Sequence, residues 1–301
     1  NTDANLATTG NGGRVTNANG YDIWFYSTSD CSTTRLSAER ELYTSTTGRY
    51  TGWVKVASLS TTTDTVIYVC YGDASVSVDP NDDANFGSTT VWDANYKGVW
   101  HLGNGTTLTA NDSTSNANNG TLKGSTLPSA TTGKIGGGAV FDGSSGYIQA
   151  SSIASPSYFT LEAWVQGTGG TQGNIMSKIG SDYDFYFRLS GGNSGYQDIN
   201  SSYHELTTSP PTNSNWHLLI LQYDGAHLTY YVDGAVSGTP LVATVNPYIE
   251  TSPLYIGSLG VGQYFSTNMD EARYSDSARS ADWIKTEYNN QSATSTFDTF
   301  G

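Results

Sequence analysis

Charged residues are scarce in this sequence, and positively charged ones are the scarcest. Of 301 residues, 13 are Lys or Arg and 27 are Asp or Glu, which gives a formal net charge of -14 at pH 7. Charged residues make up 13% of the chain, whereas an average soluble protein has about 25%. An acidic chain repels phosphate backbones and anionic lipids. We therefore expect neither a nucleic acid nor a membrane surface as a partner.

Long apolar runs are also missing. No stretch approaches the roughly 18 apolar residues that a membrane-spanning helix requires. The opening residues, NTDANLATTG, lack the basic and apolar regions of a signal peptide. We therefore expect no membrane insertion, and we interpret Asn1 as a processed or truncated start. Few lysines, together with many Ser, Thr, Asn and Gly residues, favour an extracellular, cell-surface or virion-surface protein.

Cysteine and histidine are rare, and their spacing excludes several kinds of site. Cys31 and Cys70 allow one disulfide, and the sequence leaves open whether they are bonded or free. The four histidines do not stand at the spacing of zinc ligands, and neither cysteine has a nearby His or a C-x-x-C partner. The sequence therefore indicates neither a zinc site nor a catalytic thiol.

Aromatic residues and glycine, in contrast, are abundant. The chain has 21 Tyr, 7 Trp and 34 Gly, and this composition favours strands and turns in an all-β fold. Short strand patterns between residues 21 and 72 predict a small antiparallel β-sandwich domain over residues 1–77. The polar, acidic stretch 78–95 has no sustained period and is interpreted as a solvated linker. Strand patterns at spacings of about 8 to 15 residues predict a larger sandwich or jelly roll over residues 96–301.

One short helix is expected near the C-terminus, over residues 280–289. Ser280 is a suitable N-cap, and Asp282 stands in the first turn, where a negative charge is favourable. Three residues provide an apolar side: Trp283, Ile284 and Tyr288. Because this side needs a packing partner, we expect the helix to lie against the end of the sandwich.

Catalytic patterns are not found. Glycoside hydrolases need two carboxyl groups that flank the scissile bond, but the candidate acids Glu162, Asp184 and Asp270 are dispersed. The E-x-D-x-x-E run of the sandwich-fold glucanases, the G-x-S-x-G elbow and the phosphate-binding glycine loops are all missing. We therefore expect no enzyme. A polysaccharide hydrolase that takes its acids from distant strands is the least favoured alternative.

Two strand patterns indicate a ligand-binding surface. Within residues 159–166 and 184–189, polar and aromatic side chains alternate with apolar ones. If the apolar faces meet in the core, the other side chains share one sheet surface, on which rings stack against sugars and polar groups bind hydroxyls. We interpret this surface as a carbohydrate platform; alternatively, its aromatic rings form a second packed layer under a loop. The six residues are Glu162, Trp164, Gln166, Asp184, Tyr186 and Arg188.

The larger part of the chain resembles a known family. Ordered segments that include GVWHLGNG, AVFDGSSGYIQASS, YFTLEAWVQG and MDEARYSDSARSADWIKTEYNNQ resemble the LamG-like, concanavalin A-like jelly-roll module of bacterial, archaeal and phage surface proteins. The resemblance covers about residues 96–295. It implies a two-sheet sandwich, non-catalytic recognition of carbohydrate or protein, and often a structural calcium ion. The implied calcium carboxylates are Asp142 of FDG and Asp270 of MDEARY; the alternative roles are turn formation and strand-end capping.

The first third of the chain, with GYDIWFY and LSAERELY, resembles a bacterial surface domain of unknown function that often precedes LamG-like modules. The opening strands of that domain are missing before Asn1. The resemblance therefore implies an open sheet edge, which is able to accept a strand from a neighbouring subunit.

These observations favour a non-catalytic, extracellular carbohydrate-recognition or adhesion protein whose partner is a glycan or polysaccharide. The rival hypothesis is a structural subunit of a virion, tail or surface filament. Such a subunit binds its neighbours through the edge of the N-terminal domain. The two hypotheses differ in whether the protein binds sugars or copies of itself.

Overall fold

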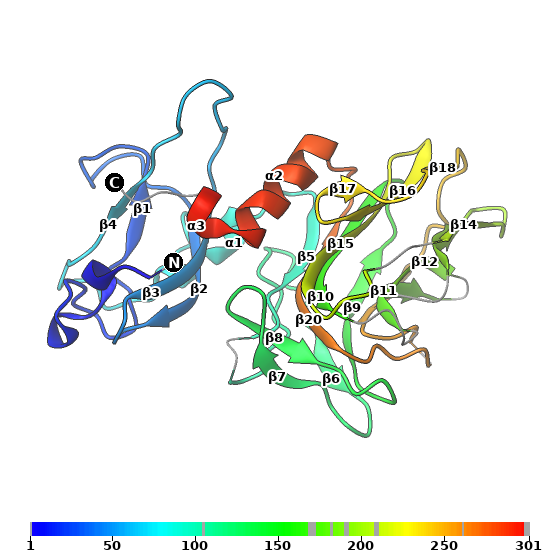
Figure 1. The fold of residues 1–301 in the computed structure, drawn as a ribbon, viewed down its shortest axis with the longest axis horizontal. Helices are drawn as coiled ribbons and strands as arrows, with labels where there is room; N and C mark the ends of the chain where they lie inside the picture. Colours follow the sequence, from blue (N-terminus) through cyan, green and yellow to red (C-terminus); the bar gives the residue numbers. More distant parts are fainter. Residues whose placement is uncertain are drawn as a thin grey trace. The chain divides into compact units, whose positions relative to one another are not determined.

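The computed structural model describes residues 2–103, 106–167, 173–180, 183–189, 193–207, 211–260 and 262–297. The chain divides into two compact units, drawn in Figure 1. Unit 1 comprises Asn1–Asp93 with Ser113–Ser115, and unit 2 comprises Ala94–Asp112 with Asn116–Gly301. Within the described ranges, every helix is too short or too polar to cross a membrane.

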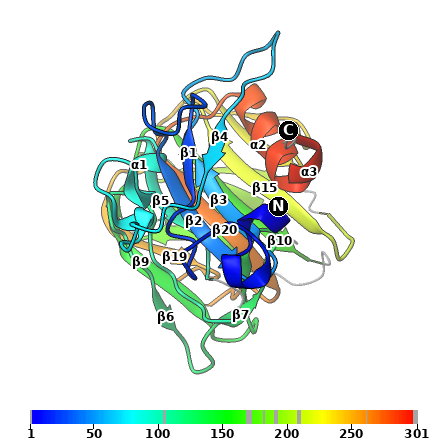
Figure 2. The same cartoon turned by 90° about the vertical axis from the view of Figure 1, so that its left-hand side faces the viewer.

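Unit 1 is a small antiparallel sandwich of two short sheets. One sheet pairs β1 (Trp24–Tyr26) with β4 (Tyr68–Cys70), and the other pairs β2 (Ala38–Thr44) with β3 (Arg49–Val54). The four strands are labelled in Figure 2. The short helices η1 (Ala4–Leu6) and η2 (Thr9–Asn11) precede them. Phe25 is part of the buried core, and residues of the other three strands pack against that core.

The acidic stretch after β4 is part of unit 1 and packs on strand β2. It forms η3 (Pro80–Asp82) and α1 (Ser88–Val91), and Asn81 exchanges hydrogen bonds of 2.7 and 2.8 Å with the backbone of Arg40 on β2. Arg40 also pairs with Asp79 at 2.6 Å. Residues 78–93 are therefore not the solvated linker that the sequence predicts. They lack a hydrophobic period because they dock through side-chain hydrogen bonds and ion pairs.

Unit 2 is a two-sheet sandwich. The order of its nine-stranded sheet is β17-β16-β15-β10-β20-β8-β7, and in addition β18 pairs with β16 and β5 pairs with β20. The strands of this sheet are β5 (Tyr96–Trp100), β7 (Ser129–Thr132), β8 (Gly137–Val140), β10 (Phe159–Gln166), β15 (Trp216–Tyr223), β16 (His227–Val232), β17 (Ala235–Val236), β18 (Leu241–Val242) and β20 (Asn268–Ser275).

The second sheet of unit 2 has seven strands in the order β14-β13-β12-β11-β19-β9-β6. Phe159 and Leu161 of the first sheet and Phe185 and Phe187 of the second are buried in one core between the sheets. This confirms the predicted jelly-roll sandwich. The strands are β6 (Thr121–Lys123), β9 (Tyr147–Ala154), β11 (Asn174–Ile179), β12 (Tyr183–Arg188), β13 (Asn193–Gln197), β14 (Tyr203–Thr207) and β19 (Thr251–Ile256).

The C-terminal helix α2 (Ala281–Ser292) confirms the predicted helix, and α3 (Thr294–Phe297) follows it. Its N-cap is Ser280, whose hydroxyl accepts the backbone N–H of Trp283 at 3.1 Å. Ile284 is fully buried and packs with Leu218 and Ile220 of β15. The helix thus covers the outer face of the nine-stranded sheet, rather than the end of the sandwich, because its apolar side matches apolar residues that this face exposes.

Candidate functional site

The six predicted platform residues lie in two different sheets. Glu162, Trp164 and Gln166 belong to β10 in the nine-stranded sheet, whereas Asp184, Tyr186 and Arg188 belong to β12 in the seven-stranded sheet. The apolar faces of the two strands do meet in the core. Two stacked sheets that bury their facing sides turn their other faces in opposite directions. The prediction that the six side chains share one surface is therefore wrong.

Trp164 lies beneath helix α2 with 1% of its surface exposed. Its indole N–H donates a hydrogen bond to Oε1 of Gln291, and its ring stacks on Tyr288 with centroids 5.9 Å apart. The Nζ of Lys134 lies 5.1 Å from the ring centroid. Beside it on β10, Gln166 accepts a hydrogen bond of 2.8 Å from Asn268. Trp164 is therefore part of a second packed layer and offers no face to a sugar.

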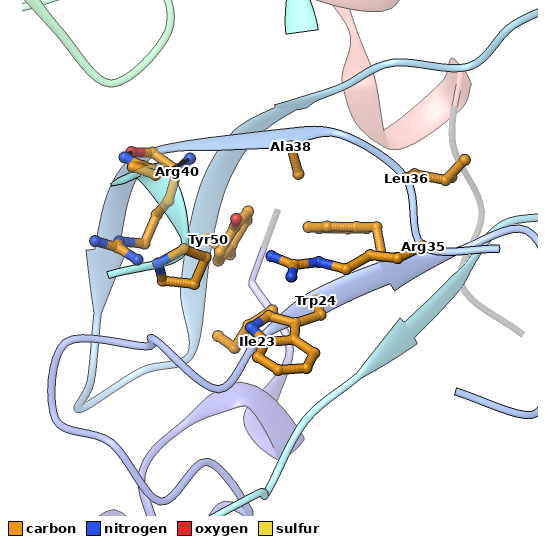
Figure 3. A pocket seen from close by; sticks show the side chains of 10 residues that line it. Ile23, Trp24, Arg35, Leu36, Ala38, Arg40 and Tyr50 are labelled. Atoms are coloured by element: carbon orange, nitrogen blue, oxygen red, sulfur yellow. Dashed lines mark hydrogen bonds between the residues drawn. The ribbon is translucent and has the colours of Figure 1, made fainter. Parts of the chain in front are cut away.

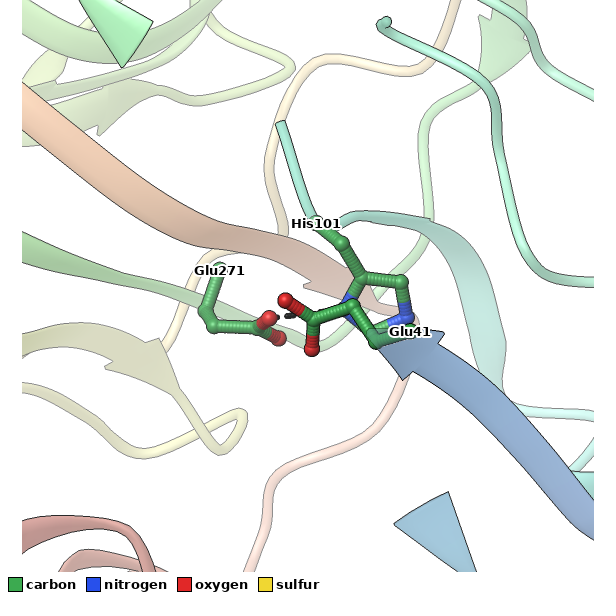
Figure 4. Close-up of side chains that lie close together, drawn as sticks. All are labelled: Glu41, His101 and Glu271. Carbon is green, nitrogen blue, oxygen red and sulfur yellow. Dashed lines mark hydrogen bonds and ion pairs between the residues drawn. The ribbon is translucent and has the colours of Figure 1, made fainter. Parts of the chain in front are cut away.

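Glu162 belongs to a buried charge network around Arg273. The Arg273 guanidinium lies 3.8 Å from Glu162, 2.6 Å from Glu271 and in contact with Glu287 of α2. Burial, with a further effect of Glu287, raises the pKa of Glu162 well above its ordinary value. Glu271 also binds Nδ1 of His101 at 2.7 Å, as Figure 4 shows. These contacts join α2 to β20.

Asp184 lies apart from its two predicted neighbours because of a β-bulge. In the ladder of β11 and β12, Lys178 faces Phe185 and Ile179 faces Tyr183, so Asp184 is an extra residue without an opposite partner. A bulge redirects the side chains of the strand that contains it. The Asp184 carboxylate contacts Nζ of Lys178, and both residues have 0% of their surface exposed.

The outer face of the seven-stranded sheet carries a continuous row of polar and tyrosine residues. Residues that stand directly opposite in a ladder point to the same side of the sheet. Tyr186 of β12 alternates with Phe185 and Phe187, which face the core, so its row faces outward. We call the following residues, in their order across the strands, the outer row: Thr121, Gln149, Tyr255, Ser177, Tyr186, Gly195 and Glu205.

Contacts between side chains fix one half of the outer row. Tyr186 donates its hydroxyl hydrogen to Oε1 of Glu205, and Oε2 of Glu205 accepts a hydrogen bond of 2.9 Å from Asn193. The Arg188 guanidinium lies over the Tyr186 ring, 4.9 Å from its centroid. Burial first, and then the bond to Glu205, raises the pKa of Tyr186. The phenol therefore keeps its proton and the donor direction of this hydrogen bond.

Three half-buried tyrosines flank the other half. The ring centroid of Tyr147 lies 6.1 Å from that of Tyr255 and 6.2 Å from that of Tyr264. Gln149 stands in the register between Thr121 and Tyr255. The sequence alone does not indicate these residues as part of a site. Alternation in GYIQAS and PLYIGSL was the available signal, but only the pairing of strands that are distant in sequence brings them together.

Hydrogen-bond donors surround Asp142, the first of the two carboxylates that the family resemblance implies as calcium ligands. Asp142 accepts backbone hydrogen bonds of 3.0, 3.0 and 2.8 Å from Ser144, Ser145 and Gly146, together with the Ser144 hydroxyl. The bond from the Ser144 side chain, followed by the backbone bonds, lowers the pKa of Asp142. Calcium needs ligand oxygens with free lone pairs. N–H and O–H groups already occupy the lone pairs of the Asp142 carboxylate. Asp142 is therefore suited to stabilising a turn and not to binding a calcium ion.

Asp270 is buried, with 0% of its surface exposed, and its Oδ2 accepts the Ile135 N–H at 2.8 Å. Among the residues that the structure describes, neither Asp142 nor Asp270 belongs to a group of three or more His, Cys, Asp or Glu side chains around a common point. The residues present do not fit the implied calcium site. Both aspartates instead bind backbone N–H groups.

Unit 1 contains the disulfide and two hollows. Cys31 and Cys70 are bonded, with their sulfur atoms 1.93 Å apart. A cleft of about 340 Å³ lies beside this disulfide. The other hollow, shown in Figure 3, has room for about one water molecule, with a volume of about 10 Å³. Arg35 lies over the Trp24 ring at its wall, 4.5 Å from the centroid. Arg35 and the small volume leave no room for a sugar.

The comparisons with known proteins agree with the architecture of unit 2. Residues 142–285 match the family model Laminin_G_3, described as the concanavalin A-like lectin/glucanases superfamily. The matched residues, which lie within unit 2, are therefore similar to this superfamily. No curated protein matches the sequence. The resemblance of the first third to a surface domain stays a prediction.

Solved structures share the fold of unit 2. The binding domain of Paraclostridial Mosquitocidal Protein 1 has a TM-score of 0.53 and 13% identity, over 65% of this chain and 52% of that one. The receptor binding domain of botulinum neurotoxin D has a TM-score of 0.51 and 12% identity. The match covers 65% of this chain and 53% of that domain. The match therefore spans about half the length of each toxin domain.

Domain 4 of AbnA, a GH43 extracellular arabinanase from Geobacillus stearothermophilus, is similar over nearly all of its length. Its structure, in complex with arabinotriose, has a TM-score of 0.50 and 18% identity. The match covers 64% of this chain and 98% of that domain. At this level of identity the likeness shows a common jelly-roll fold.

Proposed function

We propose that unit 2 is a non-catalytic carbohydrate-binding module of an extracellular protein, and that it binds sugar on the outer face of its seven-stranded sheet. The outer row carries this proposal. At one end it places half-buried Tyr255 beside the Gln149 amide and the Thr121 hydroxyl, and at the other end it carries the exposed Glu205 carboxylate; Ser177 and Tyr186 between the two ends are buried. Rings stack on the apolar faces of sugars, and the polar groups bind sugar hydroxyls. The arabinotriose complex of AbnA domain 4 supports the proposal, since a domain of this fold binds a sugar there.

The surface has accessible rings and fixed polar groups. Tyr203 at the β14 edge is 52% exposed, and its ring centroid lies 6.0 Å from that of Tyr183. Glu205 is exposed and is held by Tyr186 and Asn193. Groups already held in place lose less conformational freedom when a ligand binds. A preorganised surface of this kind suits a saccharide chain that lies across several strands.

The positions of the candidate acids support a non-catalytic role. Glu162 lies in the Arg273 network under α2, Asp184 contacts Lys178, and Asp270 binds the Ile135 backbone. Each of the three acids is 2% exposed or less. A glycoside hydrolase needs two carboxyl groups that reach the substrate together. Extracellular location agrees with the Cys31–Cys70 disulfide, since disulfides persist in oxidising compartments.

A glycan array of the purified chain, run beside light scattering, tests the proposal. We expect saturable binding by the wild type, which Tyr255→Ala weakens about 3- to 10-fold through loss of one stacking ring. Tyr158→Ala is the matched control, because Tyr158 is 46% exposed and lies outside the outer row. Equal affinities of the two variants would exclude this face as the binding site.

The rival function, a structural subunit of a virion, tail or surface filament, rests on a feature of unit 1. Each sheet described there has only two strands, so strand edges remain for pairing with another chain. A chain that self-associates through unit 1 and binds no sugar on the array would support this second candidate. A monomer that binds sugar would rule it out.

A further inference from the structure

Lys178 and Asp184 meet inside unit 2, where charged residues are unusual. Both have 0% of their surface exposed. Lys178 of β11 stands opposite Phe185, a core residue, and opposite residues share one side of a sheet. Asp184 is the extra residue of the bulge in β12, which turns its carboxylate to Lys178.

Three further groups hold the Lys178 amine. Its Nζ lies within hydrogen-bond distance of all three: 2.7 Å from the Ser155 hydroxyl, 2.9 Å from the Ser252 hydroxyl and 2.9 Å from the carbonyl of Glu250. The Ser155 hydroxyl lies 2.6 Å from Oδ2 of Asp184, the oxygen that contacts Nζ. The other oxygen, Oδ1, has no hydrogen-bond partner within the described part of the chain. The amine and the carboxyl group are thus fixed against each other.

Burial shifts the pKa values of both groups in the direction of their neutral forms. Desolvation lowers the pKa of Lys178 and raises the pKa of Asp184, against the effect of their mutual contact. The charge of Glu250 raises the pKa of Asp184 further. These shifts favour a neutral amine beside a protonated carboxyl group. That is the pair of states from which an amide forms.

We propose that Lys178 and Asp184 join through an intramolecular isopeptide bond between Nζ and Cγ. The lone pair of the neutral amine attacks Cγ and forms the C–N bond. The bond from Cγ to Oδ2 then breaks, and Oδ2 leaves as water with its own proton and one from Nζ. Oδ1 remains as the amide oxygen. Atoms and electrons balance without any oxidant, reductant or co-reactant.

The surrounding groups match the needs of this step. Ser155 lies within hydrogen-bond distance of both Nζ and Oδ2, so its hydroxyl is placed to pass the proton to the leaving oxygen. Ser252 and the Glu250 carbonyl orient the amine. Fixed reactants in a site closed to solvent react as if at very high concentration. The product links β11 covalently to β12 at the bulge.

The mass of the intact, reduced and denatured wild-type chain tests the proposal without any substitution. We expect it to be lower than the sequence mass by one water. Trypsin cleaves after Lys and Arg, and a cross-linked Lys178 resists cleavage. We therefore expect one peptide over residues 135–188, short of one water, instead of separate peptides 135–178 and 179–188. A wild-type chain of full mass that is cleaved after Lys178 would overturn the proposal.

Three variants assign the lost water to these two residues. Lys178→Arg and Asp184→Ala should each show their full sequence mass, since one reacting group is gone. Asp184→Asn should lose ammonia instead of water if Lys178 attacks the carboxamide carbon. Persistent loss of water in Asp184→Ala would place the dehydration elsewhere and overturn the assignment. Each measurement is a mass and does not require the variant to be stable.

Discussion

The hydroxyl of Tyr186 reaches Glu205 two strands away and binds its Oε1 across the position of Gly195. Tyr186 stands on β12, Gly195 on β13 and Glu205 on β14, all in one line of the register. Gly195 has no side chain to separate the other two. The bond therefore connects three strands at the edge of the proposed binding face, where a carboxylate is held beside an aromatic ring.

Tyr186→Phe tests the structural contribution of this bond. We expect the free energy of unfolding to fall by about 1 kcal/mol, because the variant loses one hydrogen bond and keeps the ring. Urea denaturation followed by fluorescence measures the change. Tyr158→Phe is the control and should be neutral, since Tyr158 is 46% exposed. Equal midpoints of urea denaturation for Tyr186→Phe and the wild type would show that this hydrogen bond does not contribute to the free energy of unfolding.

Trp164→Ala tests the role of the ring under α2. Trp164 is 1% exposed, stacks on Tyr288 and donates to Gln291. We expect a loss of about 3 to 5 kcal/mol in the free energy of unfolding, as for other buried rings cut to alanine. Trp283→Ala on the same helix is the control, with a loss below about 1 kcal/mol, because Trp283 is 47% exposed. If the Trp164→Ala variant is folded but binds sugar more weakly than the wild type, Trp164 is part of the binding site.

Local pattern was sufficient to predict much of this fold. Alternation correctly placed Phe159 and Leu161 on the core side of their strand, and Ser280 with its downstream apolar residues predicted α2. These features depend on residues that are close in sequence. The same period of two residues appears in β10 and in β12, and it does not reveal that the strands belong to different sheets. Membership of a sheet depends on pairing between distant segments.

Two further features escaped prediction for physical reasons. Alternation predicts Asp184 on the outer face, but one extra residue in β12 changes the side to which it points. A period of two residues cannot show a bulge. Residues 78–93 resemble a solvated acidic stretch in sequence. Their carboxylate and amide groups bind Arg35 and Arg40, which stand more than 35 residues earlier. Polar docking of this kind leaves no hydrophobic period.

Glu162→Gln tests the buried charge network through pH. Burial and Glu287 raise the pKa of Glu162 well above its ordinary value of 4.5. The folded chain thus keeps a proton that the unfolded chain releases, so this contribution to stability is present below about pH 4.5 and is lost as the pH rises to the folded pKa. Glutamine cannot release a proton. We expect the melting temperature of Glu162→Gln to exceed that of the wild type by a margin that widens from pH 4.5 to 7. A constant or reversed margin would show that Glu162 is ionised in the folded chain.

Chelation tests the turn role of Asp142 against an ion-binding role. An ion that binds only the folded chain must raise its stability, whereas Asp142 already accepts hydrogen bonds from Ser144, Ser145 and Gly146. We therefore expect melting curves in calcium and in chelator to coincide.

The pH dependence of stability tests the same turn. The bond from the Ser144 side chain, with the backbone bonds, lowers the pKa of Asp142. The contribution of Asp142 to the stability of the folded chain is therefore present above the unfolded pKa of about 4 and is lost as the pH falls. Asp142→Ala should therefore destabilise the chain equally in calcium and in chelator at pH 7, and less at pH 3. A melting temperature of the wild type that rises with calcium, but not in Asp142→Ala, would show that the loop rearranges to bind the ion.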